Sequence, residues 1–140
     1  MKFLSMILVI CLYFSNTKAQ EVNYQSIKGS WEYKSPKGKT KLTYKFDVDN
    51  KFTSLTEHKE KELQAEGMYE FDKKDDLDRL KLTLTDKANS NQSQILYHFI
   101  KFAGADTLKI QSVNDKQTKW LPERRRNTMI FVRKKEKPKE

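Results

Sequence analysis

The residue types in this chain that could do chemistry are few and scattered. His58 and His98 are the only two histidines, and a zinc site needs more ligands at closer spacing. Because His98 falls within an apolar segment, we expect a hydrogen-bonded core residue there, with a buried acid–base group as the alternative. The chain has no Gly-x-Ser-x-Gly elbow, and its one cysteine, Cys11, lies in the N-terminal segment described below. The sequence therefore predicts no catalytic residue, no metal site and no cofactor, and so no enzyme.

The first 19 residues have the parts of a secretion signal. Lys2 supplies a short positive region, residues 3–14 form an apolar run, and the polar stretch after it ends at Ala19. The apolar run is shorter than the ~20 residues that a membrane-spanning helix needs, which disfavours a membrane anchor. Ile10 precedes Cys11 and is not small, so no lipid anchor is expected. We predict a signal peptide at 1–19 and an exported protein, periplasmic or secreted.

The rest of the chain has the length of one domain. Residues 20–135 are expected to form it, and residues 136–140 a disordered basic tail. Without a cysteine in this region, the fold must depend on its core alone. An exported domain without disulfides suits a bacterial envelope better than the disulfide-dense domains of animal secretions.

The chain is basic, with a formal net charge of +9. Removing Lys2 and Lys18 with the signal leaves 26 Lys and Arg against 19 Asp and Glu, or about +7, which favours acidic partners. The basic cluster expected at the surface consists of Arg124, Arg125 and Arg126, followed by the run at 133–135. This cluster is either a solvated face or a contact for an anionic envelope surface or a protein. Export makes nucleic acid the least favoured partner. The acidic run at 75–78 is a turn whose spacing does not match a calcium loop.

From Ile27 onward, apolar residues alternate with polar ones, and turn residues recur every eight to twelve positions. This rhythm is typical of an antiparallel all-β domain. The expected strands contain residues 31–33, 42–46, 52–58, 63–71, 80–85, 95–102, 108–110, the vicinity of Trp120, and 129–133. Eight or nine strands predict a closed barrel, with a two-sheet sandwich as the alternative. Residues 57–66 lack a helical spacing of apolar residues and are predicted to be strand, corner and strand.

Five short motifs carry a resemblance to a known family. They are Gly29-Ser30-Trp31, the segments 46–52 and 66–71, the segment 80–86, and Thr107-Leu108-Lys109-Ile110. In order and spacing the chain resembles the small lipocalin-like domains of exported Bacteroidetes proteins. The resemblance implies an up-and-down calycin barrel of eight or nine strands. It also implies that a basic side chain of the last strand packs across Trp31 and closes one end, a role expected for Arg133, with Arg126 as the second candidate.

A barrel of this size either encloses one small ligand or is filled by its own side chains. The aromatic residues expected to line the interior are Tyr44, Phe46, Phe52, Tyr69, Tyr97, Phe99 and Trp120. Around a cavity they would suit a flat or elongated apolar or amphipathic molecule. The first hypothesis is therefore a non-catalytic protein that binds such a molecule. The alternative is an envelope interaction module with a filled barrel that acts through its basic C-terminal region.

Overall fold

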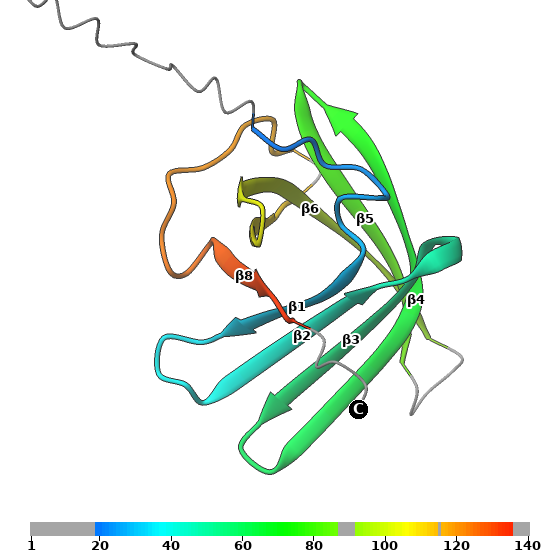
Figure 1. The fold of residues 1–140 in the computed structure, drawn as a ribbon, viewed down its shortest axis with the longest axis vertical. Coiled ribbons are helices and arrows are strands. Elements are labelled where there is room, and N and C mark those ends of the chain that lie inside the picture. The colour runs from blue at the N-terminus through cyan, green and yellow to red at the C-terminus, as the bar shows by residue number, and fades with distance from the viewer. Residues whose placement is uncertain (1–18, 87–91, 115, 136–140) are drawn as a thin grey trace, which may run out of the picture.

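The computed structural model describes residues 19–86, 92–114 and 116–135, and they form a closed barrel of eight antiparallel strands (Figure 1). Each strand pairs with its neighbours in sequence, and β8 returns to pair with β1. The strands are β1 Gly29–Lys34, β2 Thr40–Phe46, β3 Lys51–His58, β4 Lys61–Lys74, β5 Leu77–Asp86, β6 Ser93–Gly104, β7 Thr107–Ser112 and β8 Met129–Arg133, with a 3-10 turn η1 at Val48–Asn50. The predicted up-and-down barrel is confirmed. Closure of the ladder excludes the two-sheet sandwich.

Some sequence predictions concern residues outside the described ranges, and one differs from the structure. Residues 1–18 of the predicted signal, Cys11 among them, and the predicted tail at 136–140 lie outside the described residues. The strand expected around Trp120 is absent, because residues 116–128 follow an irregular path between β7 and β8. The segment 57–66 is strand, turn and strand, as predicted.

Register decides which side chains fill the barrel. Phe46 pairs with Phe52, Phe52 with Gly67, and Gly67 with Leu84, so these positions share the inner face. The pairing of β4 with both of its neighbours runs through Gly67 without a register shift. A Cβ at this position would come within 1.8 Å of the Thr83 carbonyl oxygen. Glycine therefore permits the close approach of β4 and β5.

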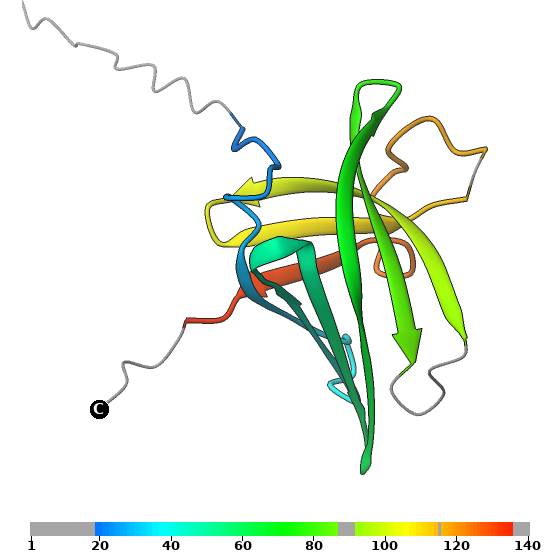
Figure 2. The same ribbon diagram turned by 90° about the vertical axis from the view of Figure 1, so that its right-hand side faces the viewer.

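The two ends of the barrel are different. Residues 19–28 precede β1 and bring Val22 and Ile27 into the buried core, at the end where β1 begins and β8 finishes. The long β4–β5 hairpin stands out beyond the other strands in Figure 2. The opposite end is bounded by the β1–β2 and β3–β4 turns and is called here the open end.

No helix in the described parts of the chain is long and apolar enough to cross a membrane.

Candidate functional site

The closed end is built around Trp31. This side chain is fully buried, and its indole nitrogen donates a hydrogen bond of 2.7 Å to the carbonyl oxygen of Ile27. Arg133 pairs with Trp31 across the β1–β8 ladder, and its guanidinium carbon lies 4.1 Å from the centroid of the Trp31 ring. The predicted closing contact is present, and Arg133 rather than Arg126 provides it.

Arg133 also fixes the N-terminal segment to the barrel. Its Nη1 donates to the Lys28 carbonyl oxygen at 2.6 Å and its Nη2 to the Ser26 carbonyl oxygen at 2.9 Å. Its Nε pairs with Asp106 at 3.1 Å. One side chain therefore joins the first strand, the last strand, the segment before β1 and the β6–β7 turn.

Aromatic rings fill the closed half of the interior. Tyr44, Phe46, Phe52 and Tyr69 are buried in the core as predicted. Phe46 lies 5.2 Å from Phe52 and 5.0 Å from Tyr69, centroid to centroid, and Tyr44 stacks on Phe131 at 4.8 Å. Contacts at these distances are those of a packed aromatic cluster. These four residues therefore pack against one another instead of standing around an empty cavity.

The other three predicted lining residues do not face the interior. In β6 the inward positions are His98, Ile100 and Phe102, which pair with inward residues of β7. Tyr97 and Phe99 have the opposite parity, and Arg79 lies over the Tyr97 ring at 4.7 Å. Their assignment to the interior was wrong.

The cause of this error is the segment 116–128, which crosses the outer face of β6 and β7. Phe99 pairs with Gln111, whose side chain bonds the backbone of Leu121 in both directions and the hydroxyl of Thr128. Trp120 lies on this segment, with the Lys101 ammonium 4.1 Å from its ring centroid. Because this segment covers the outside, β6 is apolar on both faces, and alternation alone gave the wrong parity.

Glu123 joins the same segment to β6 and β7 through two ion pairs. Its carboxylate pairs with Lys109 at 2.6 Å and with Lys101 at 3.0 Å. Hydrogen bonds from these two ammonium groups lower the pKa of Glu123 to about 2.

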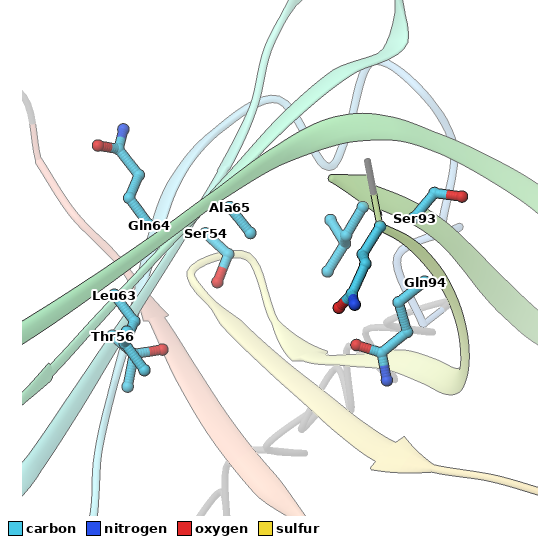
Figure 3. Close-up of a pocket in the computed structure, with 9 residues that line it drawn as sticks. Ser54, Thr56, Leu63, Gln64, Ala65, Ser93 and Gln94 are labelled. Carbon is cyan, nitrogen blue, oxygen red and sulfur yellow. The ribbon is translucent and has the colours of Figure 1, made fainter. Parts of the chain in front are cut away.

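A pocket of about 390 Å³ lies at the open end, between β3–β4 and the start of β6. Figure 3 shows its two walls, with Ser54, Thr56 and Leu63 on one side and Ser93 and Gln94 on the other. The full lining is Ser54, Thr56, Leu63, Gln64, Ala65, Leu84, Gln92, Ser93 and Gln94. None of the seven predicted aromatic residues is among them. Small polar side chains mixed with leucine and alanine would suit a molecule with both polar and apolar parts.

His98 lies on the same inward face of β6 as Gln94, four residues further along the strand. It is 4% exposed, its Nδ1 lies 3.2 Å from the Ser112 hydroxyl, and its Nε2 has no hydrogen-bond partner among the described residues. Burial lowers the pKa of His98 to about 4, so the imidazole is neutral at pH 7. Burial likewise raises the pKa of Tyr44 to about 12. His98 is a core residue with one polar atom left unsatisfied.

The remaining candidates lie on the surface. His58 is exposed, with its Nδ1 2.6 Å from the Thr40 hydroxyl. Asp75 and Asp76 form the exposed β4–β5 turn, as the sequence predicted. Within the described residues, no group of three or more His, Cys, Asp or Glu side chains is placed to hold a metal ion.

The predicted basic cluster is at the surface. Arg124, Arg125 and Arg126 are exposed in a turn closed by Asn127, whose side chain accepts from the Arg124 backbone N–H at 2.9 Å.

Comparison of the chain with protein-family models, curated proteins and solved structures gave no significant match.

Proposed function

We propose that this protein is an exported, non-catalytic, lipocalin-like barrel that binds a small amphipathic molecule in the open half of its interior. The pocket between β3–β4 and the start of β6 carries this proposal. Its walls offer hydroxyl and amide groups from Ser54, Thr56 and Gln94 beside the apolar side chains of Leu63 and Leu84. A closed barrel is a rigid support for such a site, because its walls have no free sheet edges across the pocket.

The Nε2 atom of His98 is a second reason to place a ligand in the open half of the barrel. Leaving a buried polar atom without a partner costs about 1–3 kcal/mol. A hydroxyl or carbonyl of a ligand that reached past Gln94 would remove this cost. The closed half offers no comparable opportunity, because its aromatic rings are already in contact.

The test is native mass spectrometry of the protein purified from its own envelope, followed by organic extraction. The expected result is a stoichiometric small molecule bound to the wild-type protein and absent from Ala65→Trp, which places an indole in the pocket. Met68→Trp is the matched control, because Met68 lies on the same strand, is exposed and faces outward. A bare wild-type mass, or equal occupancy in Ala65→Trp, would contradict the proposal.

A second candidate function rests on the basic cluster. Among the described residues no carboxylate pairs with Arg124, Arg125 or Arg126, and neighbouring Glu123 is engaged by two lysines. Such a cluster would suit an anionic envelope surface. Replacing all three arginines by alanine should weaken sedimentation with phosphatidylglycerol vesicles, and the wild-type association should fall as salt rises. If binding changes neither with salt nor with the substitution, contact with an anionic surface through this cluster is excluded.

A further inference from the structure

The seam where the barrel closes is its least complete junction. β1 and β2 pair over six positions, whereas β1 and β8 pair only at Trp31↔Arg133 and Glu32↔Val132, with one further hydrogen bond from the Lys134 N–H to the Ser30 carbonyl oxygen. Figures 1 and 2 both show the two strands meeting near the end of β8 and separating toward its start. The seam is therefore closed beside Trp31 and open toward the other end.

Backbone groups at the open part of the seam lack a ladder partner. In an antiparallel pair, hydrogen-bonded positions recur every second residue. After Ser30 with Lys134 and Glu32 with Val132, the next such position would join Lys34 to Ile130, and the described ladder stops before it. The N–H and C=O groups of Ile130 that would face β1 form a free strand edge, which is a template for another strand.

Side chains frame this edge as a groove on the outer surface. The groove has a volume of about 380 Å³ and is lined by Glu32, Lys34, Ile130, Val132, Arg133 and Lys134. Ile130 is 49% exposed and Val132 is 54% exposed. On the inner side, the rings of Tyr33 and Phe131 lie 5.7 Å apart. These two rings lie between the seam and the core, so the groove is a surface site separate from the interior pocket.

Charge decides which kind of strand fits. Lys34 and Lys134 are exposed beside the groove, and among the described residues no carboxylate pairs with Lys134. The 3.3 Å ion pair between Lys34 and Glu32 is at the surface, so it is weak enough for an incoming carboxylate to compete. A second copy of this chain is disfavoured, because each copy has a net charge of about +7 without residues 1–19 and would bring further cations to the groove.

We propose that the seam between β1 and β8 binds an extended acidic segment of another protein, which adds a strand to the free edge of β8. The segment pairs its backbone with Ile130, places apolar side chains on Ile130 and Val132, and directs carboxylates to Lys34 and Lys134. Backbone pairing provides affinity and the alternating side chains provide selectivity.

The test uses a labelled eight-residue peptide, Glu-Thr-Val-Thr-Val-Thr-Glu-Thr, titrated with the purified protein by fluorescence anisotropy. Because the side chains of a strand alternate between its two faces, this order places the valines and the glutamates together on the face that meets the groove. Binding should weaken at least about tenfold when the peptide amides that face β8 are N-methylated, because the hydrogen bond to the Ile130 carbonyl oxygen is lost and the methyl groups block the close approach of the two strands. The same peptide with lysine in place of both glutamates should bind at least about tenfold more weakly, because it meets like charges.

Ile130→Glu and Ile95→Glu form a matched pair of protein variants. Both replace an exposed isoleucine, 49% and 53% exposed respectively, and both lower the net charge equally. Only Ile130→Glu should lose peptide binding, and amide NMR shifts in the wild type should be largest at Lys34 and Ile130. Equal binding by both variants, or undiminished binding of the N-methylated peptide, overturns the proposal. It is also overturned if the protein sediments as a dimer that the peptide does not dissociate and Ile130→Glu does, because the occupant is then a second copy.

Discussion

The two halves of the barrel interior differ in the side chains that fill them. Toward the closed end the inward positions are large and aromatic, including Trp31, Phe46 and Phe52, and each is at most 1% exposed. Toward the open end the same strands present smaller or polar residues, such as Ser54 and Thr56 of β3, which line a pocket. One barrel thus combines a region that provides stability with a region that leaves space for a ligand.

The largest effect is expected at the centre of the closed half. Trp31→Ala should lower the free energy of unfolding by about 3–5 kcal/mol, because it removes a fully buried ring and leaves a cavity. Urea unfolding followed by circular dichroism measures the loss. Trp120→Ala is the control, since Trp120 is only half-buried on the outer segment, and its loss should be clearly smaller. Equal losses would show that the closed half is not the main source of stability.

The next effect concerns the buried imidazole of His98. Its pKa is about 4 in the folded protein and about 6.5 in an unfolded chain. Between these values the unfolded state binds more protons, so stability is lost as pH falls from about 6.5 to about 4. The loss from this one group is about 3 kcal/mol.

Comparison with His98→Gln isolates this contribution, because the carboxylates that titrate in acid are common to both proteins. Unfolding free energies measured from pH 7 to pH 4 should fall less in the variant. His58→Gln is the matched control, since it removes an exposed imidazole and leaves His98 in place. Parallel curves for wild type and His98→Gln would mean that the imidazole is hydrated or charged in the fold.

A smaller effect is expected from the side chain that closes the barrel. Arg133→Ala removes the contact with Trp31 and the hydrogen bonds to Lys28 and Ser26, and should cost about 2 kcal/mol in thermal or urea unfolding. Lys135→Ala, at an exposed position just beyond β8, should stay within about 0.5 kcal/mol of wild type. Similar small changes in both variants would make Arg133 an ordinary surface residue.

The closed half could be predicted from the sequence because its signals are local. Strict alternation along 80–84 indicates the inward face of β5, and Leu80 and Leu82 are fully buried. The contact of Trp31 with Arg133 was expected only from the resemblance to calycin barrels, with Arg126 as the second candidate. Alternation identifies the inward face of a strand wherever its outer face is exposed to solvent.

The candidate site was harder to predict because it is marked only by small side chains at inward positions. Ser54 and Thr56 follow Phe52 at the same parity, so alternation places them inward, but small polar residues do not by themselves distinguish a pocket from a filled interior. In β6 the parity itself was ambiguous, since the segment 116–128 covers the outer face through contacts distant in sequence, such as Gln111 with Thr128. Apolar residues at both parities of 95–102 indicate that both faces of this strand are covered, but they do not indicate which face is the interior of the barrel.

The smallest expected effect is also the sharpest comparison, because it uses two positions on one strand. Phe52 and Ser54 both face inward from β3, but Phe52 is buried among aromatic rings and Ser54 lines the pocket. Phe52→Ala should cost about 3–5 kcal/mol, whereas Ser54→Ala should change stability by no more than about 0.5 kcal/mol. If urea unfolding instead shows a loss above about 1 kcal/mol for Ser54→Ala, its hydroxyl belongs to a buried polar network. The open half would then be built for rigidity as the closed half is, and its space would be less available to a ligand.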